Sequence, residues 1–374
     1  MNIQEAKETI EKALRAYFAR DEIGFPLVPL RQQRPILLIG PPGIGKTAIM
    51  EQIAEECGVG LVAYTMTHHT RQSAMGLPEI CTREIEGKTV HTTEYTMSEI
   101  IASIYDCMEQ TGKKRGILFL DEINCVSETL APVMLQLLQD KKFGNQHIPD
   151  DWLIVAAGNP PEYNKSVREF DVATLDRVRK IEVVPELSVW LSYAEKNQIH
   201  SAVTTYLMAH SDHFYSVSQE ADEKRFVTAR GWEDLSELMQ VYESLGIPID
   251  RQVVEQYLQL PQVASDFANY LQLYDKYKQV YRVDELLSGT WEPVRASELR
   301  DAPFDEKLGV LGLLLSRLAD GARDAYRLDA LTDALHADLL AIREGEKAIA
   351  SLPDEKRTAL ADKRNGGSSD KNTH

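Results

Sequence analysis

The chain has 374 residues, 43% of them hydrophobic and 26% charged, which is ordinary for a protein with a buried core and two or three domains. Its net charge of −17 disfavours nucleic acid as a partner and favours other proteins. No membrane span or signal peptide is recognisable, and the 4 widely spaced cysteines indicate reduced thiols in a cytoplasmic protein.

Apolar residues recur at three- and four-residue spacing between residues 3 and 18, which predicts an amphipathic helix. A polar, proline-containing loop from Asp21 to Pro35 separates this helix from an apolar strand, Ile36–Ile39. The loop either shapes the pocket for the base of a nucleotide or serves as a connector.

The strand leads into a glycine-rich loop, and a helical pattern follows the loop. Its residues are Gly40, Pro41, Pro42, Gly43, Ile44, Gly45, Lys46 and Thr47. This is the pattern G-x-x-x-x-G-K-[ST] in the strand–loop–helix context that it needs. The glycines allow backbone N–H groups to converge on a phosphate chain, and the helix N-terminus adds its dipole. Lys46 is expected to reach the β- and γ-phosphates and Thr47 to bind Mg²⁺, whereas the alternative is an ordinary turn between core elements.

A second strand is predicted at 61–64, followed by a polar loop at 67–78. Residues 83–95 are expected to form a short hairpin that turns at Gly87. Thr96 and Glu99 have the spacing of a capping box for the next helix.

An unbroken apolar run at 117–120 ends in two carboxylates, Asp121 and Glu122. Such a run is typical of a strand buried in a parallel sheet, and ligands bind at the carboxyl ends of such strands. Asp121 is expected to hold Mg²⁺ and Glu122 to orient and polarise the attacking water. A solvated acidic pair is the alternative, and the phosphate loop upstream argues against it.

The next predicted strand, 152–157, ends in Gly158 and Asn159, after a small hairpin at 142–149. Asn159 at this edge of the sheet is placed to bond the γ-phosphate or the attacking water, although Asn-Pro alone is simply a turn.

Two arginines, Arg177 and Arg179, precede a last strand at 181–184. Either they are charges at a helix C-terminus, or one of them reaches the γ-phosphate held by a neighbouring subunit. The residues by themselves favour the first interpretation.

The pattern is helical from Pro185 onward, with a polar interruption at 212–227 that is compatible with a hairpin. Arg230 lies in the first turn of one of these helices, and its side chain is expected to point toward the group that lies next to the helix N-terminus. Two further helices are expected near 305–318 and 325–350.

The order of these features resembles the AAA+ ATPases, and among them the MoxR-like group of the helix-2-insert clade, over about residues 1–280. The resemblance implies that Asn159 is the sensor 1 residue and Arg230 the sensor 2 residue. It implies that Arg177 is the trans-acting arginine finger, and Arg179 is a rival because Val178 stands where phenylalanine is usual. The hairpins at 83–95 and 142–149 are similar to the helix-2 insert and the pre-sensor 1 insert.

The fold implied is an α/β P-loop AAA+ core of three layers with a parallel sheet, followed by an all-α lid and a C-terminal helical extension. The expected domains are the core at 1–185, the lid at 186–290, a helical region at 291–363 and a disordered tail at 364–374.

The activity implied is Mg²⁺-dependent hydrolysis of ATP by a ring of identical subunits, commonly a hexamer. Such rings remodel or mature protein complexes, often with a partner that carries a von Willebrand factor A domain. The alternatives are an ATP-gated assembly switch with negligible turnover and, with less support, a nucleic-acid-linked nucleoside triphosphatase. The choice between ATP and GTP and the identity of the protein client stay open at this point.

Overall fold

The computed structural model describes residues 1–350 except 86, 145, 164–166, 221–222 and 291–292. The chain forms two compact units, Met1–Leu273 and Tyr274–His374. The predicted disordered tail at 364–374 lies outside the described residues, as does the end of the helical region expected to reach residue 363.

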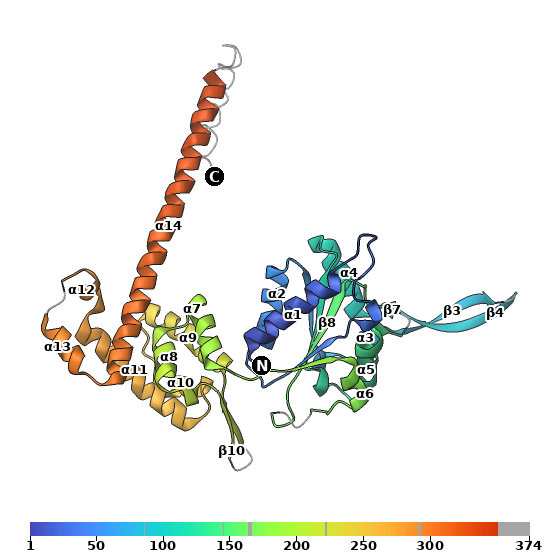
Figure 1. Cartoon of the computed structure of the whole chain (residues 1–374), viewed down its shortest axis with the longest axis horizontal. Helices are drawn as coiled ribbons and strands as arrows, with labels where there is room; N and C mark the ends of the chain where they lie inside the picture. Colours follow the sequence, from blue (N-terminus) through green and yellow to red (C-terminus); the bar gives the residue numbers. More distant parts are fainter. Residues whose placement is uncertain (86, 145, 164–166, 221–222, 291–292, 351–374) are drawn as a thin grey trace, which may run out of the picture. The chain divides into compact units, whose positions relative to one another are not determined.

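A five-stranded parallel sheet forms the centre of the first unit (Figure 1), in the order β2-β5-β8-β1-β9. Its strands are β1 (Ile36–Ile39), β2 (Gly60–Thr65), β5 (Gly116–Asp121), β8 (Trp152–Gly158) and β9 (Arg179–Glu182). The carboxyl ends of β1, β5 and β8 therefore meet at one edge, where an open α/β sheet binds its ligands.

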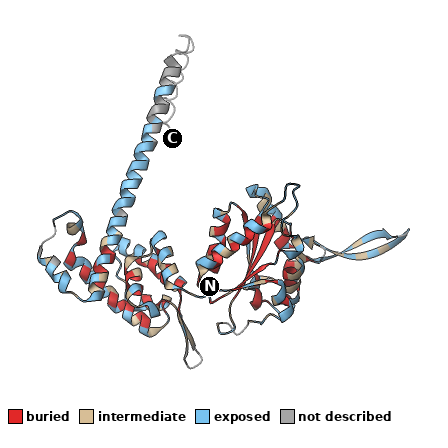
Figure 2. Ribbon diagram, in the orientation of Figure 1, coloured by how far each residue is buried: buried red, intermediate tan, exposed pale blue. Residues whose placement is uncertain are grey.

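Helices cover both faces of this sheet, which gives the three layers expected from the sequence. The helices of the core are α1 (Ile3–Phe18), α2 (Lys46–Glu56), α3 (Arg71–Met75), α4 (Glu99–Thr111), α5 (Ala131–Asp140) and α6 (Val172–Arg177). Strand residues such as Leu38 and Phe119 pack against α1 and α2, and their neighbours Leu37 and Leu118 pack against α4 and α5. Figure 2 shows these strands as buried, which explains why they read as continuous apolar runs. The predicted three-layer α/β core with a parallel sheet is confirmed.

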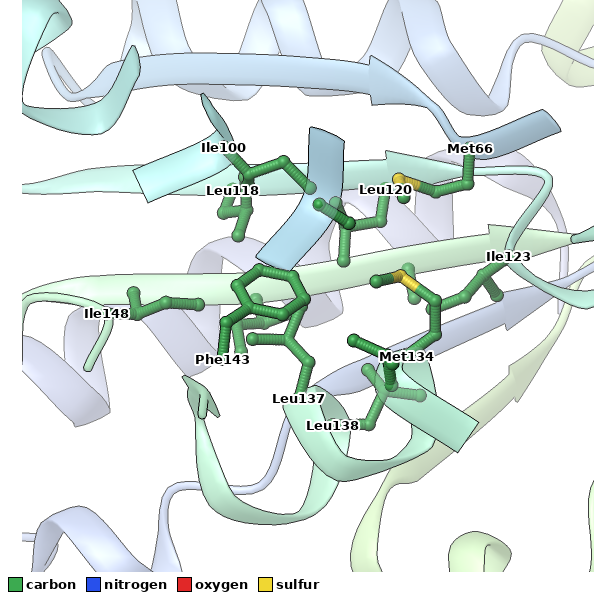
Figure 3. Close-up of a cluster of buried hydrophobic side chains, with 14 of the residues drawn as sticks. Met66, Ile100, Leu118, Leu120, Ile123, Met134, Leu137, Leu138, Phe143 and Ile148 are labelled. Carbon is green, nitrogen blue, oxygen red and sulfur yellow. The ribbon is translucent and has the colours of Figure 1, made fainter. Parts of the chain in front are cut away.

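A cluster of buried side chains lies beneath the edge where β5 ends (Figure 3). Met66, Leu120 and Ile123 belong to this cluster and pack with Met134 and Leu137 of α5. In the sequence, Met66, Leu120 and Ile123 are each followed directly by a polar residue. Burial of these apolar side chains therefore fixes the backbone from which the polar side chains project.

Three antiparallel hairpins form separate two-stranded sheets outside the central sheet. They are β3 (Pro78–Ile85) with β4 (Lys88–Tyr95), β6 (Lys142–Phe143) with β7 (Gln146–His147), and β10 (Ser216–Glu220) with β11 (Glu223–Val227). The first begins earlier than the predicted 83–95 and extends as a ribbon beyond the core (Figure 1).

The predicted capping box of α4 is wrong. The hydroxyl of Thr96 accepts a hydrogen bond from the N–H of Leu77 at 2.9 Å, at the base of the first hairpin. Ser98, not Thr96, precedes the helix, and its side chain makes no capping bond. The Thr96 hydroxyl therefore bonds to a backbone N–H at the base of the hairpin and not, as its spacing had predicted, to the N-terminus of the helix.

The second half of the first unit is helical. Its helices are α7 (Leu187–Lys196), α8 (Ser201–Ala209), α9 (Ala229–Leu245), α10 (Arg251–Tyr257) and α11 (Pro261–Tyr281), the last of which continues into the second unit. Aromatic rings form its core, since Trp232 lies 5.0 Å from Phe267 and 5.7 Å from Tyr206 between ring centroids. This packing holds the start of α9, which carries Arg230.

The second unit contains α12 (Val283–Leu287), α13 (Pro293–Asp301) and α14 (Phe304–Ala350). The two helices expected near 305–318 and 325–350 are one helix of 47 residues. Gly321 interrupts the apolar pattern but not the helix, because a single exposed glycine costs only about 1 kcal/mol relative to alanine.

Candidate functional site

The glycine-rich loop turns sharply between β1 and α2. Gly43 and Gly45 have φ of 71° and 89°, in the left-handed region that favours glycine. A Cβ atom at Gly40 would lie 2.7 Å from the carbonyl oxygen of Val183, so only glycine allows this close approach. Nothing lies within 4 Å of the position of a Cβ atom at Gly45, which is the N-cap of α2. The loop thus leaves open space at a helix N-terminus, where an anion is stabilised.

Lys46 directs its ammonium group into the inside of this loop. Its side chain is buried, and Nζ donates hydrogen bonds to Gly40 O at 2.8 Å, Pro41 O at 2.7 Å and Asn159 Oδ1 at 3.0 Å. The pKa of Lys46 is lowered to about 8, because burial, assisted by the nearby charge of Arg230, outweighs the raising effect of Asp121 and Glu122. Phosphate oxygens would relieve this cost, because they supply negative charge to a desolvated cation.

Thr47 and Asp121 bring two oxygen ligands together beside Lys46. Thr47 Oγ1 donates a hydrogen bond to Asp121 Oδ2 at 3.1 Å, and Asp121 Oδ1 accepts another from the N–H of Glu122 at 2.8 Å. Hydroxyl and carboxylate oxygens suit Mg²⁺. Within the described ranges, no group of three or more His, Cys, Asp or Glu residues is arranged to hold a metal ion. A magnesium ion here would therefore take its other ligands from phosphate and water.

Glu122 projects from a strained turn directly after β5. Its φ is 55°, which a residue with a side chain adopts only where the surroundings fix it. Its Oε2 accepts a hydrogen bond from Thr67 Oγ1 at 2.8 Å. The role of Thr67 was not predicted, although it is the first hydroxyl residue of the polar loop that follows β2.

Asn159 is placed by β8 beside the phosphate loop, as predicted, with its side-chain oxygen against Lys46. A second asparagine, Asn124, bonds to its backbone at 2.8 Å and 3.3 Å. No local pattern points to Asn124, apart from its position two residues after Glu122.

The start of α9 lies against the phosphate loop. The N–H of Arg230 donates to Gly43 O at 3.2 Å, and the hydroxyl of Tyr215 donates to Pro42 O at 2.9 Å. The hydroxyl of Thr228 caps the helix by accepting from the N–H of Gly231 at 3.1 Å. Arg230 therefore joins the residues around Lys46. The contact of Tyr215 with the phosphate loop was not predicted from the sequence.

Arg177 and Arg179 do not join this cluster within the chain. Arg177 is exposed at the end of α6, where it donates to Ala173 O at 3.2 Å. Arg179 is half-buried in β9 and pairs with Ile36, at the end of β1 far from the loop. The last strand starts two residues earlier than predicted, because an edge strand tolerates charged side chains.

The affinity for nucleotide is expected to fall as pH rises through the pKa of Lys46, which is about 8. Below this pH the free protein carries the charged form that phosphate binds. Above it, binding must take up a proton, so the affinity for Mg-ATP decreases by up to about tenfold per pH unit. Titration calorimetry between about pH 7 and 9.5 measures this slope.

Lys46→Arg is the matched control for this pH dependence, because a guanidinium does not titrate in this range. Its affinity should change little with pH, whatever its absolute value. A wild-type affinity that is flat across the same range would contradict the assignment of Lys46 as the titrating group.

Residues 35–178 match the family described as AAA domain (dynein-related subfamily). Midasin from Giardia intestinalis is 31% identical over 117 residues, which is 30% of this chain and 2% of the Giardia protein. A crystal structure from Cytophaga hutchinsonii, provisionally described as an ATPase, is 16% identical over 48% of this chain and 46% of that one, with a TM-score of 0.29.

The chain therefore contains an AAA domain, and the matched residues run from the start of β1 to the end of α6. They include Lys46, Asp121, Glu122, Asn159 and Arg177. The chain spans only a small fraction of Midasin. Among the described helices, none has the length and apolar character needed to cross a membrane.

Proposed function

We propose that this AAA domain hydrolyses ATP to ADP and phosphate with Mg²⁺. The observation that carries the proposal is the convergence of four groups at one edge of the sheet. Lys46 Nζ lies 3.0 Å from Asn159 Oδ1, Thr47 Oγ1 lies 3.1 Å from Asp121 Oδ2, and Glu122 adjoins Asp121. An ammonium, an amide, a pair of Mg²⁺ ligands and a further carboxylate are the groups that phosphoryl transfer to water requires.

Each residue has a distinct part in this proposal. The loop backbone and Lys46 bind the β- and γ-phosphates of the substrate. Thr47 and Asp121 would hold Mg²⁺, which neutralises charge on the phosphates when bound. Glu122, held by Thr67, orients and polarises the attacking water, and Asn159 contacts the γ-phosphate. Arg230 contacts the phosphates from the start of α9.

The site is completed by a second subunit in this proposal. Arg177 is exposed at the end of α6 and donates to Ala173 O of its own helix, which suits an arginine that acts on a neighbouring subunit. The resemblance to ring-forming ATPases supports a homo-oligomer, commonly a hexamer. Arg179 is the alternative finger, although its half-buried place in β9 favours Arg177.

The cellular role that we propose is the remodelling or maturation of protein complexes in the manner of the MoxR-like group. The order of motifs supports this assignment, as do the two hairpins at the positions of the inserts of that group. The net charge of −17 supports a protein client over nucleic acid. A partner with a von Willebrand factor A domain is part of the same proposal.

The test of this function is phosphate release by the purified full chain with Mg-ATP over a series of protein concentrations. Turnover should disappear with EDTA and return with Mg²⁺. Turnover per subunit should rise with concentration, because the site needs a second copy. GTP in parallel reactions measures the base preference.

Two other outcomes would replace the proposal. Assembled protein that binds ATP but releases no phosphate over hours would be an ATP-gated assembly switch. Salt-dependent DNA binding that stimulates turnover would indicate a nucleic-acid-linked nucleoside triphosphatase.

A further inference from the structure

The side-chain amide of Asn124 is paired with the backbone of Asn159. Asn124 Nδ2 donates to Asn159 O at 2.8 Å, and the N–H of Asn159 donates to Asn124 Oδ1 at 3.3 Å. The ladder between β5 and β8 ends at the pair Leu120 and Ala156. An amide side chain offers the same donor and acceptor as a peptide group, so Asn124 continues this ladder beyond the end of β5.

The surroundings of this amide are closely packed. Asn124 is buried, and a Cβ atom at Gly158 would lie 2.5 Å from Asn124 Oδ1. Glycine at position 158 is therefore what allows the amide to reach the backbone of the next residue. The contact leaves little freedom in the position of Asn159, whose Oδ1 lies 3.0 Å from Lys46 Nζ.

Asn124 also belongs to the turn that carries the two carboxylates. It lies in the 3₁₀ turn Ile123–Cys125, directly after Asp121 and Glu122. Its own carbonyl oxygen accepts a hydrogen bond from the N–H of Arg168 at 2.9 Å. One residue therefore connects the end of β5, the end of β8 and the segment that precedes α6.

We propose that Asn124 is a positioning residue that sets where the Asn159 amide meets the terminal phosphate. The proposal rests on the nucleotide site proposed above and assigns a residue that the motifs do not contain. By holding both the N–H and the C=O of Asn159, Asn124 fixes the direction of the Asn159 side chain. The γ-phosphate is then recognised by the Asn159 amide and Lys46 together, so that the protein distinguishes ATP from ADP.

The experiment compares the binding of Mg-ADP with that of a non-hydrolysable ATP analogue by titration calorimetry. The wild type should prefer the triphosphate, and Asn159→Ala and Asn124→Leu should each lose about tenfold of that preference, since a hydrogen bond to a charged group is lost. The double variant should lose no more than either single variant, because both act through the same contact.

Two further variants separate positioning from general stability. Gln33→Met is the matched control: Gln33 is a buried amide that donates to Tyr17 O at 3.1 Å and Val28 O at 2.9 Å, and it is not among the phosphate-binding residues, which alone meet the group that distinguishes ATP from ADP. It should lower the melting temperature and leave the preference unchanged. Gly158→Ala keeps Asn124 but forces its amide away, and should lower the preference in the same direction even if Asn124→Leu does not fold.

The proposal is overturned if Asn124→Leu and Gly158→Ala keep the wild-type preference, or if the losses from Asn124→Leu and Asn159→Ala add. An equal loss in Gln33→Met would also overturn it, as would a wild type without preference for the triphosphate. Because the measurement is of binding, a wild type that prefers ATP but never hydrolyses it would refute the proposed activity and leave this inference standing.

Discussion

Replacement of Glu122 by glutamine is expected to lower the rate of ATP hydrolysis by about 10²–10⁴-fold, the usual contribution of a positioned general base. The amide keeps the size of the side chain and can still accept the hydrogen bond from Thr67 Oγ1, which is 2.8 Å long in the native protein. It no longer carries the charge that polarises water. Nucleotide affinity should stay within about twofold of the wild type, because Lys46 and the loop backbone bind the phosphates.

Phosphate release and nucleotide binding, measured on the same preparation, check this expectation. Glu51→Gln is a suitable control, since Glu51 is exposed on α2 and should have no effect on the rate. Turnover of Glu122→Gln equal to that of the wild type would remove Glu122 from the mechanism. Loss of binding in this variant would instead indicate a disturbed fold of the strained turn.

Replacement of Arg177 by alanine is expected to lower turnover by about 10³–10⁵-fold, the contribution of arginine fingers in other nucleoside triphosphatases. The stability of the monomer should change little, because the side chain is exposed and donates to Ala173 O of its own helix at 3.2 Å. Arg179→Ala should keep most of the activity. The opposite result in the two variants would assign the finger to Arg179.

Mixing two inactive variants tests whether Arg177 acts across a subunit boundary. Arg177→Ala subunits keep a complete phosphate loop and Glu122, whereas Glu122→Gln subunits keep Arg177. In mixed oligomers, an Arg177→Ala site that faces a Glu122→Gln neighbour contains every group, so activity should return. No return of activity in oligomers proven to contain both variants would contradict action in trans.

The fold of the core and most of the site follow from local sequence. The phosphate loop and the Asp121–Glu122 pair are each encoded by a few consecutive residues, and the strands before them read as apolar runs because both faces of the sheet are covered. Thr67 and Asn124 act through contacts to residues 55 and 35 positions away, which no local pattern records.

The errors have the same origin. The hydroxyl of Thr96 had the spacing of a helix cap, but a backbone N–H from the far side of a hairpin competes for it. Two helices were expected near 305–318 and 325–350, whereas α14 is continuous from Phe304 to Ala350, because the glycine at position 321 costs an exposed helix too little to break it. Arg179 was expected to precede the last strand, yet it lies in that strand, which is at the edge of the sheet and tolerates charged side chains.

The hydrogen bonds from Tyr215 and Arg230 to Pro42 O and Gly43 O have a mechanical consequence. Both bonds end on main-chain atoms of the phosphate loop, so no side-chain substitution in the loop removes these acceptors directly. Helix α9 begins at this attachment and continues for 17 residues, a rigid arm about 25 Å long at 1.5 Å per residue. A rotation of the loop backbone by about 10° would displace the far end of that arm by about 4 Å. Small rotations of the loop backbone would thereby be magnified at the far end of α9.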